Sequence, residues 1–432
     1  MSAGVRRTFA SLSVPNYRRY FGGQVVSITG NWMQMVAEMW LVVELTGNGV
    51  SVGLTAALQF LPVLLFGAWG GLLADRMSKR RLLMVTQSLM ALPALTLYAL
   101  TVSGSVEIWM VYALVLVRGT LNALDNPARQ SFVIEMVGDD RVVNAVALNS
   151  VIVHTARILG PAAAGAVIAL LGVGPCFLIN AVSFAAMLAA LRAMDPRELN
   201  TPERAARERG QLRSALAYVA RTPGLRIPLA MMALAGTLSF NFQVLLPLLA
   251  SFTWHGTASL YTALAVAMGI GSVTGALVAG ARARVGPTLL VGAAAAFGVA
   301  LLLVAAAPTI PLQLLALVPL GAVSVTFAAG VNSAMQLAVD PLMRGRVMAL
   351  YSVVFLGSTP IGAPLVGWIA EVAGPRAGLV LGGAAALVAA AGAKVAFDRA
   401  AAATTAPATT PPCESSSRRR TARPRPRLGT RP

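Results

Sequence analysis

The sequence has little charge, little histidine and almost no cysteine. Only 12% of its 432 residues are charged, whereas soluble domains carry about 25% charged residues. The two cysteines, Cys176 and Cys413, lie far apart, and no cysteine or histidine cluster has metal-ligand spacing. A Walker P-loop, a Gly-x-Ser-x-Gly elbow and a potassium-filter sequence are also missing. We therefore expect no ATP hydrolysis, no metal site, no cofactor and no enzymatic activity.

Long apolar runs dominate the sequence instead. Hydrophobic residues make up 57% of it, and the mean hydropathy is +0.72. Runs of about 20 apolar residues match a bilayer core about 30 Å thick, whereas the alternating strands of an outer-membrane barrel are not visible. We predict an all-α polytopic membrane protein with twelve transmembrane helices. They are expected at about 20–44, 52–74, 82–102, 108–128, 143–171, 175–194, 228–252, 258–280, 287–307, 311–333, 346–373 and 377–398.

The positive charge is placed on one side of these helices. The net charge is +18, and every Lys and Arg except Arg118, Arg157 and Arg376 falls in alternate loops or in the two tails. Cytoplasmic loops carry such an excess, so both termini are expected in the cytoplasm. This placement also argues against nucleic acid as a partner, although a soluble protein of this charge would suggest it. The first apolar run is too long for a signal peptide.

Six helices, a basic stretch and six more helices indicate two halves. The tail rich in Ala, Thr, Pro and Arg cannot bury apolar area, so we expect it to be disordered, either solvated or against anionic lipid headgroups. The expected units are a basic cytoplasmic arm at 1–19, a six-helix bundle at 20–194, a cytoplasmic linker at 195–227, a second bundle at 228–398 and the tail at 399–432.

An internal repeat supports the two halves. One constant offset pairs Gly119 with Gly321, and the same offset pairs Gly160 with Gly362. The helices that carry the first glycine of each pair are therefore expected to be copies of those that carry the second. We predict two pseudo-symmetric bundles related by an axis along the membrane normal.

A polar stripe runs along the first predicted helix. Gln24, Asn31 and Glu38 recur every seven residues, nearly two helical turns, and Gln34 lies between them on the same face. Lipid penalises such a stripe, so it should face other helices or a wet cavity. Interhelical hydrogen bonds, worth about 0.6 kcal/mol each, are one interpretation. A proton or cation site at the ionisable Glu38 is the other.

The fourth predicted helix carries Arg118, Asn122, Asp125 and Arg129 on one face. Arg118 is placed near the middle of the membrane, where an unpaired arginine costs about 2.5–3.5 kcal/mol. It therefore needs a partner or water.

The fifth predicted helix carries His154 and Arg157 on one face. His154 is either a hydrogen-bonded packing residue or a proton relay. Arg157 is expected to form a buried pair with Glu38, which leaves Arg118 as a second cation. The resulting positive surplus favours an anionic or carboxylate-bearing substrate.

A short basic loop between the second and third helices resembles the loop signature of the major facilitator superfamily, G-x-x-x-D-R-x-G-R-R. The matching residues are Gly71, Asp75, Arg76, Lys79 and Arg80, with Ser78 where glycine is usual. The resemblance implies a cytoplasmic gate in which Asp75, Arg76 and Arg80 form a charge cluster with Asp125, next to Arg129. A static ion network and a solvated turn that only sets topology are the alternatives.

A Gly-Pro pair in the fifth helix resembles the antiporter signature of exporters in this superfamily. Gly160, Pro161 and Gly165 form it, and Gly362 and Pro364 repeat it in the second half. Proline removes a helix hydrogen bond and permits a bend, and glycine lets another helix approach. Ordinary kinks with small packing residues are the alternative.

The segments 16–24, 28–34 and 125–131 look like the drug and siderophore exporter branch that includes the enterobactin exporters. This resemblance implies a monomeric bacterial inner-membrane transporter that exchanges protons for a small organic compound by alternating access. Besides the small compound and protons, its expected partner is membrane lipid. The expected proton-coupling residues are Glu38 and His154. The expected cavity residues are Gln24, Asn31, Gln34, Arg118, Asn122 and Arg157.

Other functions remain open at this point. Proton symport of an anionic nutrient would use the same fold in the opposite direction. A membrane scaffold or receptor without transport belongs to a different class, and the charged residues inside the membrane argue against it.

Overall fold

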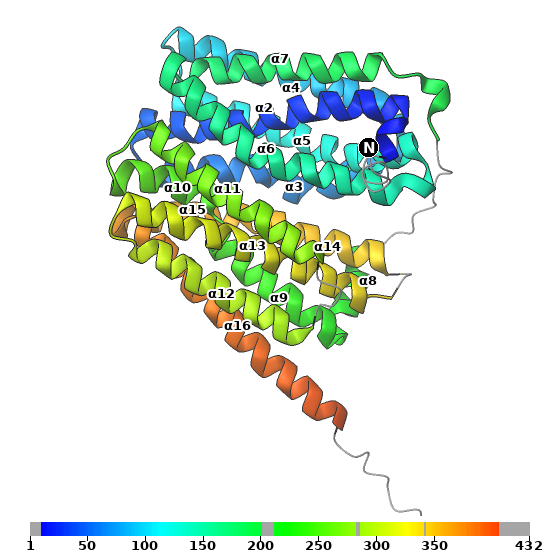
Figure 1. Ribbon diagram of the computed structural model, residues 1–432, viewed down its shortest axis with the longest axis vertical. Coiled ribbons are helices and arrows are strands. Elements are labelled where there is room, and N and C mark those ends of the chain that lie inside the picture. Colours follow the sequence, from blue (N-terminus) through cyan, green and yellow to red (C-terminus); the bar gives the residue numbers. More distant parts are fainter. Residues whose placement is uncertain (1–9, 201–210, 282–285, 341–342, 406–432) are drawn as a thin grey trace, which may run out of the picture.

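The computed structural model describes residues 10–200, 211–281, 286–340 and 343–405, except for a few side chains, among them those of residues 68–76. The described chain is helical almost throughout (Figure 1). The first bundle contains α2 (Pro15–Thr46), α3 (Gly49–Arg76), α4 (Lys79–Val102), α5 (Ile108–Val137), α6 (Val142–Leu171) and α7 (Gly174–Arg192). Short 3-10 turns, η1 (Ala10–Ser13), η2 (Asp139–Arg141) and η3 (Pro196–Glu198), flank these helices.

The second bundle is built from more pieces. It contains α9 (Pro223–Leu238), α10 (Phe242–Leu248), the π-turn η4 (Leu249–Thr253), α11 (Ala258–Ala281), α12 (Pro287–Ala306), α13 (Ile310–Ala338), α14 (Arg344–Gly357), α15 (Thr359–Ala373) and α16 (Pro375–Thr405). Within the described residues, eleven segments are long and apolar enough to cross a membrane. The polar stripe keeps α2, with 32 residues, outside that group. With α2 counted, the twelve-helix prediction is confirmed.

Two predicted spans are not continuous helices. The span expected at 228–252 breaks between α9 and α10, where the Asn241 side chain donates to the Thr237 carbonyl, 2.7 Å away. That side chain takes over the acceptor of a main-chain hydrogen bond. The span expected at 346–373 breaks at Ser358, because Pro360 cannot donate to the preceding turn.

Two helices extend across expected unit boundaries, and a third helix lies within the expected linker. α2 begins at Pro15, inside the expected arm, because proline is favoured in the first turn of a helix. The expected linker contains the amphipathic helix α8 (Gln211–Arg221), whose Ala215 and Val219 are buried. α16 continues to Thr405, past residue 398, because the alanines there are strong helix formers. Residues 1–9, 201–210 and 406–432 lie outside the described part.

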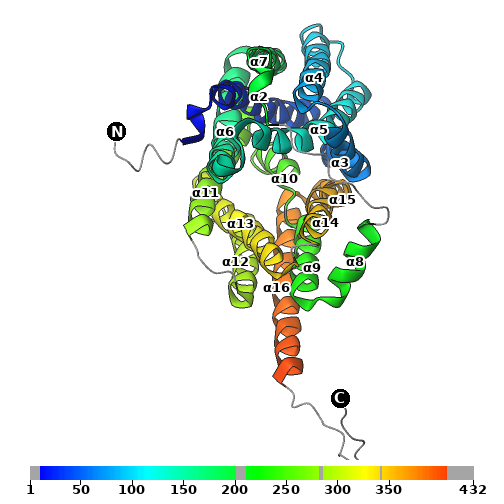
Figure 2. The same cartoon turned by 90° about the vertical axis from the view of Figure 1, so that its right-hand side faces the viewer.

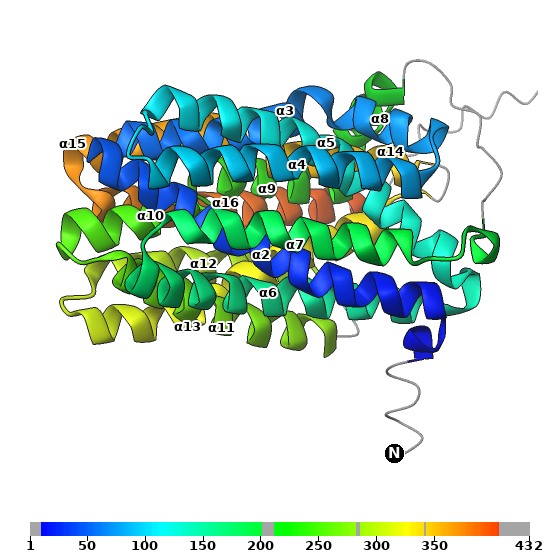
Figure 3. The ribbon, with the colours of Figure 1, turned by 90° about the horizontal axis from the view of Figure 1, so that it is seen from above.

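The two bundles meet along two seams. α3 packs against α15 on one side, and α6 packs against α11 on the other (Figures 1 and 2). The spans of both bundles run roughly along one common direction (Figure 3). Further contacts of α10 with α2 and α3, and of α14 with α3, also join the two bundles.

Equivalent glycines confirm the pseudo-symmetry. Gly119 of α5 faces the backbone of α3, and its mate Gly321 of α13 faces the backbone of α11. Gly160 of α6 faces α2, and its mate Gly362 of α15 faces α9. A Cβ at any of these positions would collide with the facing helix. The glycines therefore mark the same close helix crossings in both halves.

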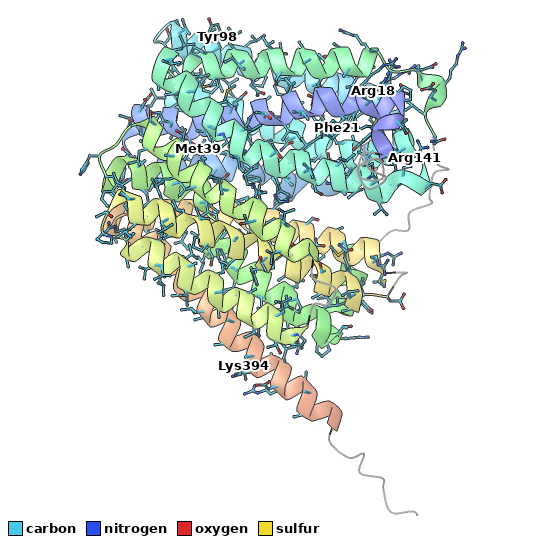
Figure 4. All side chains as sticks on the ribbon, viewed as in Figure 1. Arg18, Phe21, Met39, Tyr98, Arg141 and Lys394 are labelled. Atoms are coloured by element: carbon cyan, nitrogen blue, oxygen red, sulfur yellow. The ribbon has the colours of Figure 1, made fainter. Side chains whose placement is uncertain are left out.

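The two ends of the helices differ in charge. Arg18 and Arg141 lie at the end where α2 begins, and Tyr98 lies at the other (Figure 4). We call the first the basic end and the second the opposite end. α3, α5, α11 and α13 finish at the basic end, whereas α3 and α11 begin at the opposite end.

Candidate functional site: a cavity between the bundles

A cavity of about 660 Å³ lies between the two bundles. Its walls come from α2, α3 and α6 on one side. On the other side they come from Phe240, at the break between α9 and α10, and from α10, α11, α13, α14 and the first residue of α15. Trp32, Met35, Phe60, His154, Arg157 and Pro161 line it from the first bundle. Phe240, Phe242, Tyr261, Asn332, Tyr351 and Phe355 are among its residues from the second.

Aromatic rings form the wall of the second bundle. Phe240 lies at the break between α9 and α10, and its ring centroid is 5.6 Å from that of Phe355 and 6.1 Å from that of Phe242. Tyr351 stacks on Phe355 at 6.1 Å. Phe297 lies fully buried 4.9 Å behind Phe240 and supports it. Such a wall suits flat or apolar ligands, since aromatic rings pack face and edge at these distances.

Arg157 is the cation of the cavity. Its guanidinium carbon lies 5.1 Å from the ring centroid of Trp32, a cation–π contact, and both residues line the cavity. Its Nε is buried without a hydrogen-bond partner among the described residues. His154 also lines the cavity, and its Nδ1 has no described partner either. No acidic side chain is among the described lining residues.

The expected pair between Glu38 and Arg157 is not formed. Glu38 is fully buried and pairs with Arg118 of α5 instead. Gln34 donates to the same carboxylate at 2.7 Å, and Asn180 of α7 donates to Gln34. The stripe of α2 therefore faces α5 and α7 inside its own bundle, and this interhelical network leaves Arg157 free to face the cavity.

Most of the expected cavity residues lie outside it. Asn180 donates weakly to Asn31 at 3.5 Å, and Arg129 donates to Gln24. Asn122 is half-buried on α5. Of the six residues expected there, only Arg157 lines the cavity; Gln24, Asn31, Gln34, Arg118 and Asn122 do not. Polar groups on one helix face pair with the nearest helices of the same bundle, because a buried group without a partner is costly.

The expected gate cluster is divided among separate partners. Asp125 pairs with Arg129 and accepts hydrogen bonds from Thr86 at 2.6 Å and from Gln87 at 2.9 Å. Arg80 does not reach Asp125, since it donates to the carbonyls of Leu191 and Arg192 at the end of α7.

The rest of the basic loop is described only in part. Lys79 pairs with Glu135 near the end of α5, which ties the start of α4 to α5. Gly71, Asp75 and Arg76 belong to α3, but their side chains lie outside the described residues. Their part in a gate stays a prediction.

The glycine–proline segments lie at the seams. Pro161 lines the cavity, and Gly165 leaves room for Thr262 of α11, in the other bundle. In the second half, Pro364 lies at the crossing of α15 and α3, where a Cβ on Gly53 would meet its Cα at 2.9 Å. These segments therefore set how closely the bundles approach.

The cavity is closed at the opposite end. Trp40 of α2 stacks on Tyr261 of α11, with ring centroids 6.2 Å apart and planes 22° apart. Gly49, the first residue of α3, donates its backbone N–H to Glu371 of α15. Both contacts join one bundle to the other and seal that end.

Toward the basic end the cavity continues. A second cavity of about 510 Å³ lies between α6, α11 and α13 and shares His154, Val325, Ala329 and Ser333 with the first. Its walls reach from His154 to Ala147 on α6 and to Gly280 near the end of α11. Together the two cavities extend from Tyr261 on α11 to Gly280 near the end of the same helix.

Sequence reasoning missed the aromatic wall and Glu371. Tyr351 and Phe355 are spaced by four residues, and Phe240 and Phe242 lie two apart, but aromatics are also common in lipid-facing positions. Glu371 could have been noticed as an acid at the end of a span in the half of the chain that is poor in charge.

Comparison with known proteins identifies the family. Residues 6–416 match the family model described as a transmembrane secretion effector, of the major facilitator type. The chain is 26% identical over 263 residues to the staphyloferrin A transporter of Staphylococcus aureus, a match that spans 60% of this chain and only 65% of that protein. It is 26% identical over 361 residues to the multidrug efflux pump Tap of Mycolicibacterium fortuitum, or 81% of this chain and 87% of that one.

The fold agrees with this assignment. A crystal structure of the nucleoside transporter NupG superposes with a TM-score of 0.71 at 14% identity, covering 88% of this chain and 99% of that chain. At this identity the likeness shows the fold alone. The chain is a multi-pass membrane protein and not an enzyme, and it belongs to the transmembrane secretion effector family of major facilitator transporters.

Proposed function

We propose that the protein exports a small organic compound, such as a drug or a siderophore, in exchange for protons. The observation that carries the proposal is the cavity itself, which is lined from both bundles, closed at one end and continued toward the other. A pseudo-symmetric pair of bundles can rock about such a site and expose it to each side in turn. The relatives named for siderophore and drug transport support the class of cargo.

We place the basic end in the cytoplasm of a bacterial inner membrane. The excess of Lys and Arg at that end supports this orientation, because cytoplasmic loops carry such an excess. Both termini then lie in the cytoplasm, and the described conformation takes up cargo from inside. The opening that releases cargo would form where Trp40 meets Tyr261.

Glu38 is our candidate for the proton-coupling carboxylate. When Glu38 is protonated, its pair with Arg118 is lost, and a buried arginine without a counter-charge must find another partner. α2 would shift as a result, and α2 also carries Trp32 in the cavity and Trp40 at the closed end. One proton entering down 100 mV supplies about 2.3 kcal/mol. His154 is the second candidate, since it lies where the two cavities join.

The test combines a deletion strain with reconstituted protein. A drug and siderophore susceptibility panel on the strain, complemented with wild type, should reveal protected compounds, and Glu38→Gln should fail to protect. Glu107→Gln, an exposed acid at the opposite end, is the matched control and should protect like wild type. In proteoliposomes, an imposed pH gradient should drive the identified compound uphill against the proton flow. Equal complementation by Glu38→Gln would remove Glu38 from the mechanism.

The same assay separates the alternatives. Uptake of an anionic nutrient together with protons would show as flux in the same direction as the proton gradient. The lone cation Arg157 in the cavity is the observation that keeps this alternative open. A scaffold or receptor predicts no gradient-driven flux for any compound in the panel.

A further inference from the structure

Three cations of the first bundle, buried or nearly so, have carboxylate partners among the described residues. Glu38 neutralises Arg118, Asp125 neutralises Arg129 and Glu135 neutralises Lys79, each by a direct contact. Among the described residues, no carboxylate pairs with Arg157. The cavity therefore carries one permanent positive charge that no carboxylate of the described residues compensates.

Arg157 is held in place by packing. The Trp32 ring lies under its guanidinium, and Gly160, one turn further along α6, lets α2 come close enough for this contact. A Cβ on Gly160 would collide with the Cβ of Trp32. On the other side, α11 packs against the backbone of Arg157. A Cβ added to Gly269 of α11 would lie 3.1 Å from the carbonyl oxygen of Arg157. The guanidinium is thus presented from a rigid position, with its Nε buried and unpaired.

The opposite wall offers rings and no charge. Phe240, Phe242 and Phe355 face the cavity from the second bundle, and the lining polar groups there are neutral ones such as Asn332 and Ser333. A bound molecule would therefore meet a cation on α6 and an apolar aromatic surface across from it. A guanidinium binds carboxylate and other planar oxyanions through paired hydrogen bonds.

We infer that the cavity binds amphipathic organic anions, with the anionic group on Arg157 beside Trp32 and the aromatic or apolar body against the wall formed by Phe240, Phe242 and Phe355. This inference rests on the proposed transport function, because it names the chemical class of the cargo. Organic cations are disfavoured in this site, since the guanidinium would repel them at close range in a medium of low dielectric constant.

The test uses three probes of one shape and different charge. Anthracene-9-carboxylate, the neutral anthracene-9-carboxamide and the cationic 9-(aminomethyl)anthracene are titrated against the purified full chain by quenching of tryptophan fluorescence. The wild type should bind the carboxylate about tenfold more tightly than the carboxamide, as expected for a hydrogen bond to a charged group. It should bind the amine most weakly.

Substitutions at one position should then reorder the probes. Arg157→Gln should bring the carboxylate to the affinity of the carboxamide, and Arg157→Glu should make the amine the preferred probe. The matched control is Arg376→Gln, because Arg376 also stacks on a tryptophan, 5.4 Å from the ring of Trp254, but does not line the cavity. It should leave the order unchanged.

Each outcome of these titrations supports or overturns the proposed ligand class. Equal binding of the three probes by wild type, or an unchanged order in Arg157→Glu, overturns the inference. Should the Gln and Glu variants not fold, Arg157→Lys takes their place: retained preference for the carboxylate supports the inference, and its loss in a folded protein contradicts it. Binding is measured without a gradient, so it is separate from transport. Selective binding without gradient-driven flux refutes export alone, and flux that ignores charge refutes the ligand class alone.

Discussion

The carboxylate of Glu371, near the end of α15, accepts a hydrogen bond from the backbone N–H of Gly49 at the start of α3. The acceptor belongs to one bundle and the donor to the other. A helix start carries partial positive charge, so the carboxylate is favoured there. Opening the opposite end must separate these two groups, because both lie on the seam that closes it.

Glu371→Ala should shift the protein toward the state that opens at the opposite end. The expected shift is roughly two- to fivefold, since an exposed side-chain charge such as that of Glu371 at a helix start is worth about 0.3–1 kcal/mol. Met35→Cys, in the cavity wall of α2, reports this opening through its labelling rate with a membrane-impermeant maleimide added on that side. Glu107→Ala is the control, and an unchanged labelling rate in Glu371→Ala would show that Glu371 does not hold the end shut.

Gly367→Ala should destabilise the closed seam between α15 and α3. A Cβ at Gly367 would collide with the carbonyl of Gly49, so the two helices must move apart. Overpacking of this kind costs about 1–3 kcal/mol, which should lower the midpoint of thermal unfolding. Gly392→Ala in α16, where nothing lies within 4 Å, is the matched control. It should be neutral or slightly stabilising, and equal effects of both variants would contradict the close packing.

Single and double substitutions should show that Glu38 and Arg118 act as a pair. Glu38→Gln removes the negative charge of the pair and leaves the positive one, and Arg118→Gln does the reverse. Breaking a buried pair in this way costs about 3–5 kcal/mol. Arg118→Gln should be the more damaging for stability, because it leaves a fully buried carboxylate without its counter-charge. The double variant should lose less than the sum of the two, as measured by unfolding in detergent. Additive losses would mean that the contact contributes nothing.

Phe240→Leu should weaken binding of aromatic probes while leaving the charge preference intact. The substitution keeps an apolar side chain but removes the ring that contacts Phe242, Phe355 and Phe297. Aromatic pairs contribute about 0.5–1.5 kcal/mol beyond burial, so a loss of roughly two- to tenfold in affinity is expected. Phe66→Leu, on an exposed position of α3, should have no effect. Fluorescence titration with anthracene-9-carboxylate measures both.

The helices and the repeat were predictable because they depend on local properties. Apolar run length determines a span, and the paired glycines such as Gly119 and Gly321 mark equivalent crossings in each half. Helix breaks were less predictable. The Asn241 side chain competes for a main-chain acceptor, whereas Pro360 lacks a main-chain donor. Residue type alone does not predict a break, because other prolines of this chain lie inside intact helices, Pro93 for example.

The partners of the charged residues were not predictable from the sequence. Periodicity places Glu38 on a stripe, but the rotation of α2 within its bundle decides whether Arg118 or Arg157 meets it. The prediction chose Arg157, and the structure has Arg118. The aromatic wall was not predictable either, because Phe240 comes from the break after α9, Phe242 from α10 and Phe355 from α14.

The charged pairs lie in the first bundle and the ring-lined wall lies in the second. Substitutions in the charged pairs and substitutions in the aromatic wall can therefore accumulate independently. Exchanging one ring for another in α10 or α14 changes the wall of the cavity and leaves the charged pairs of the first bundle in place. Two ancestral copies that began alike would in this way have diverged, one keeping buried charge pairs and the other an aromatic cavity wall.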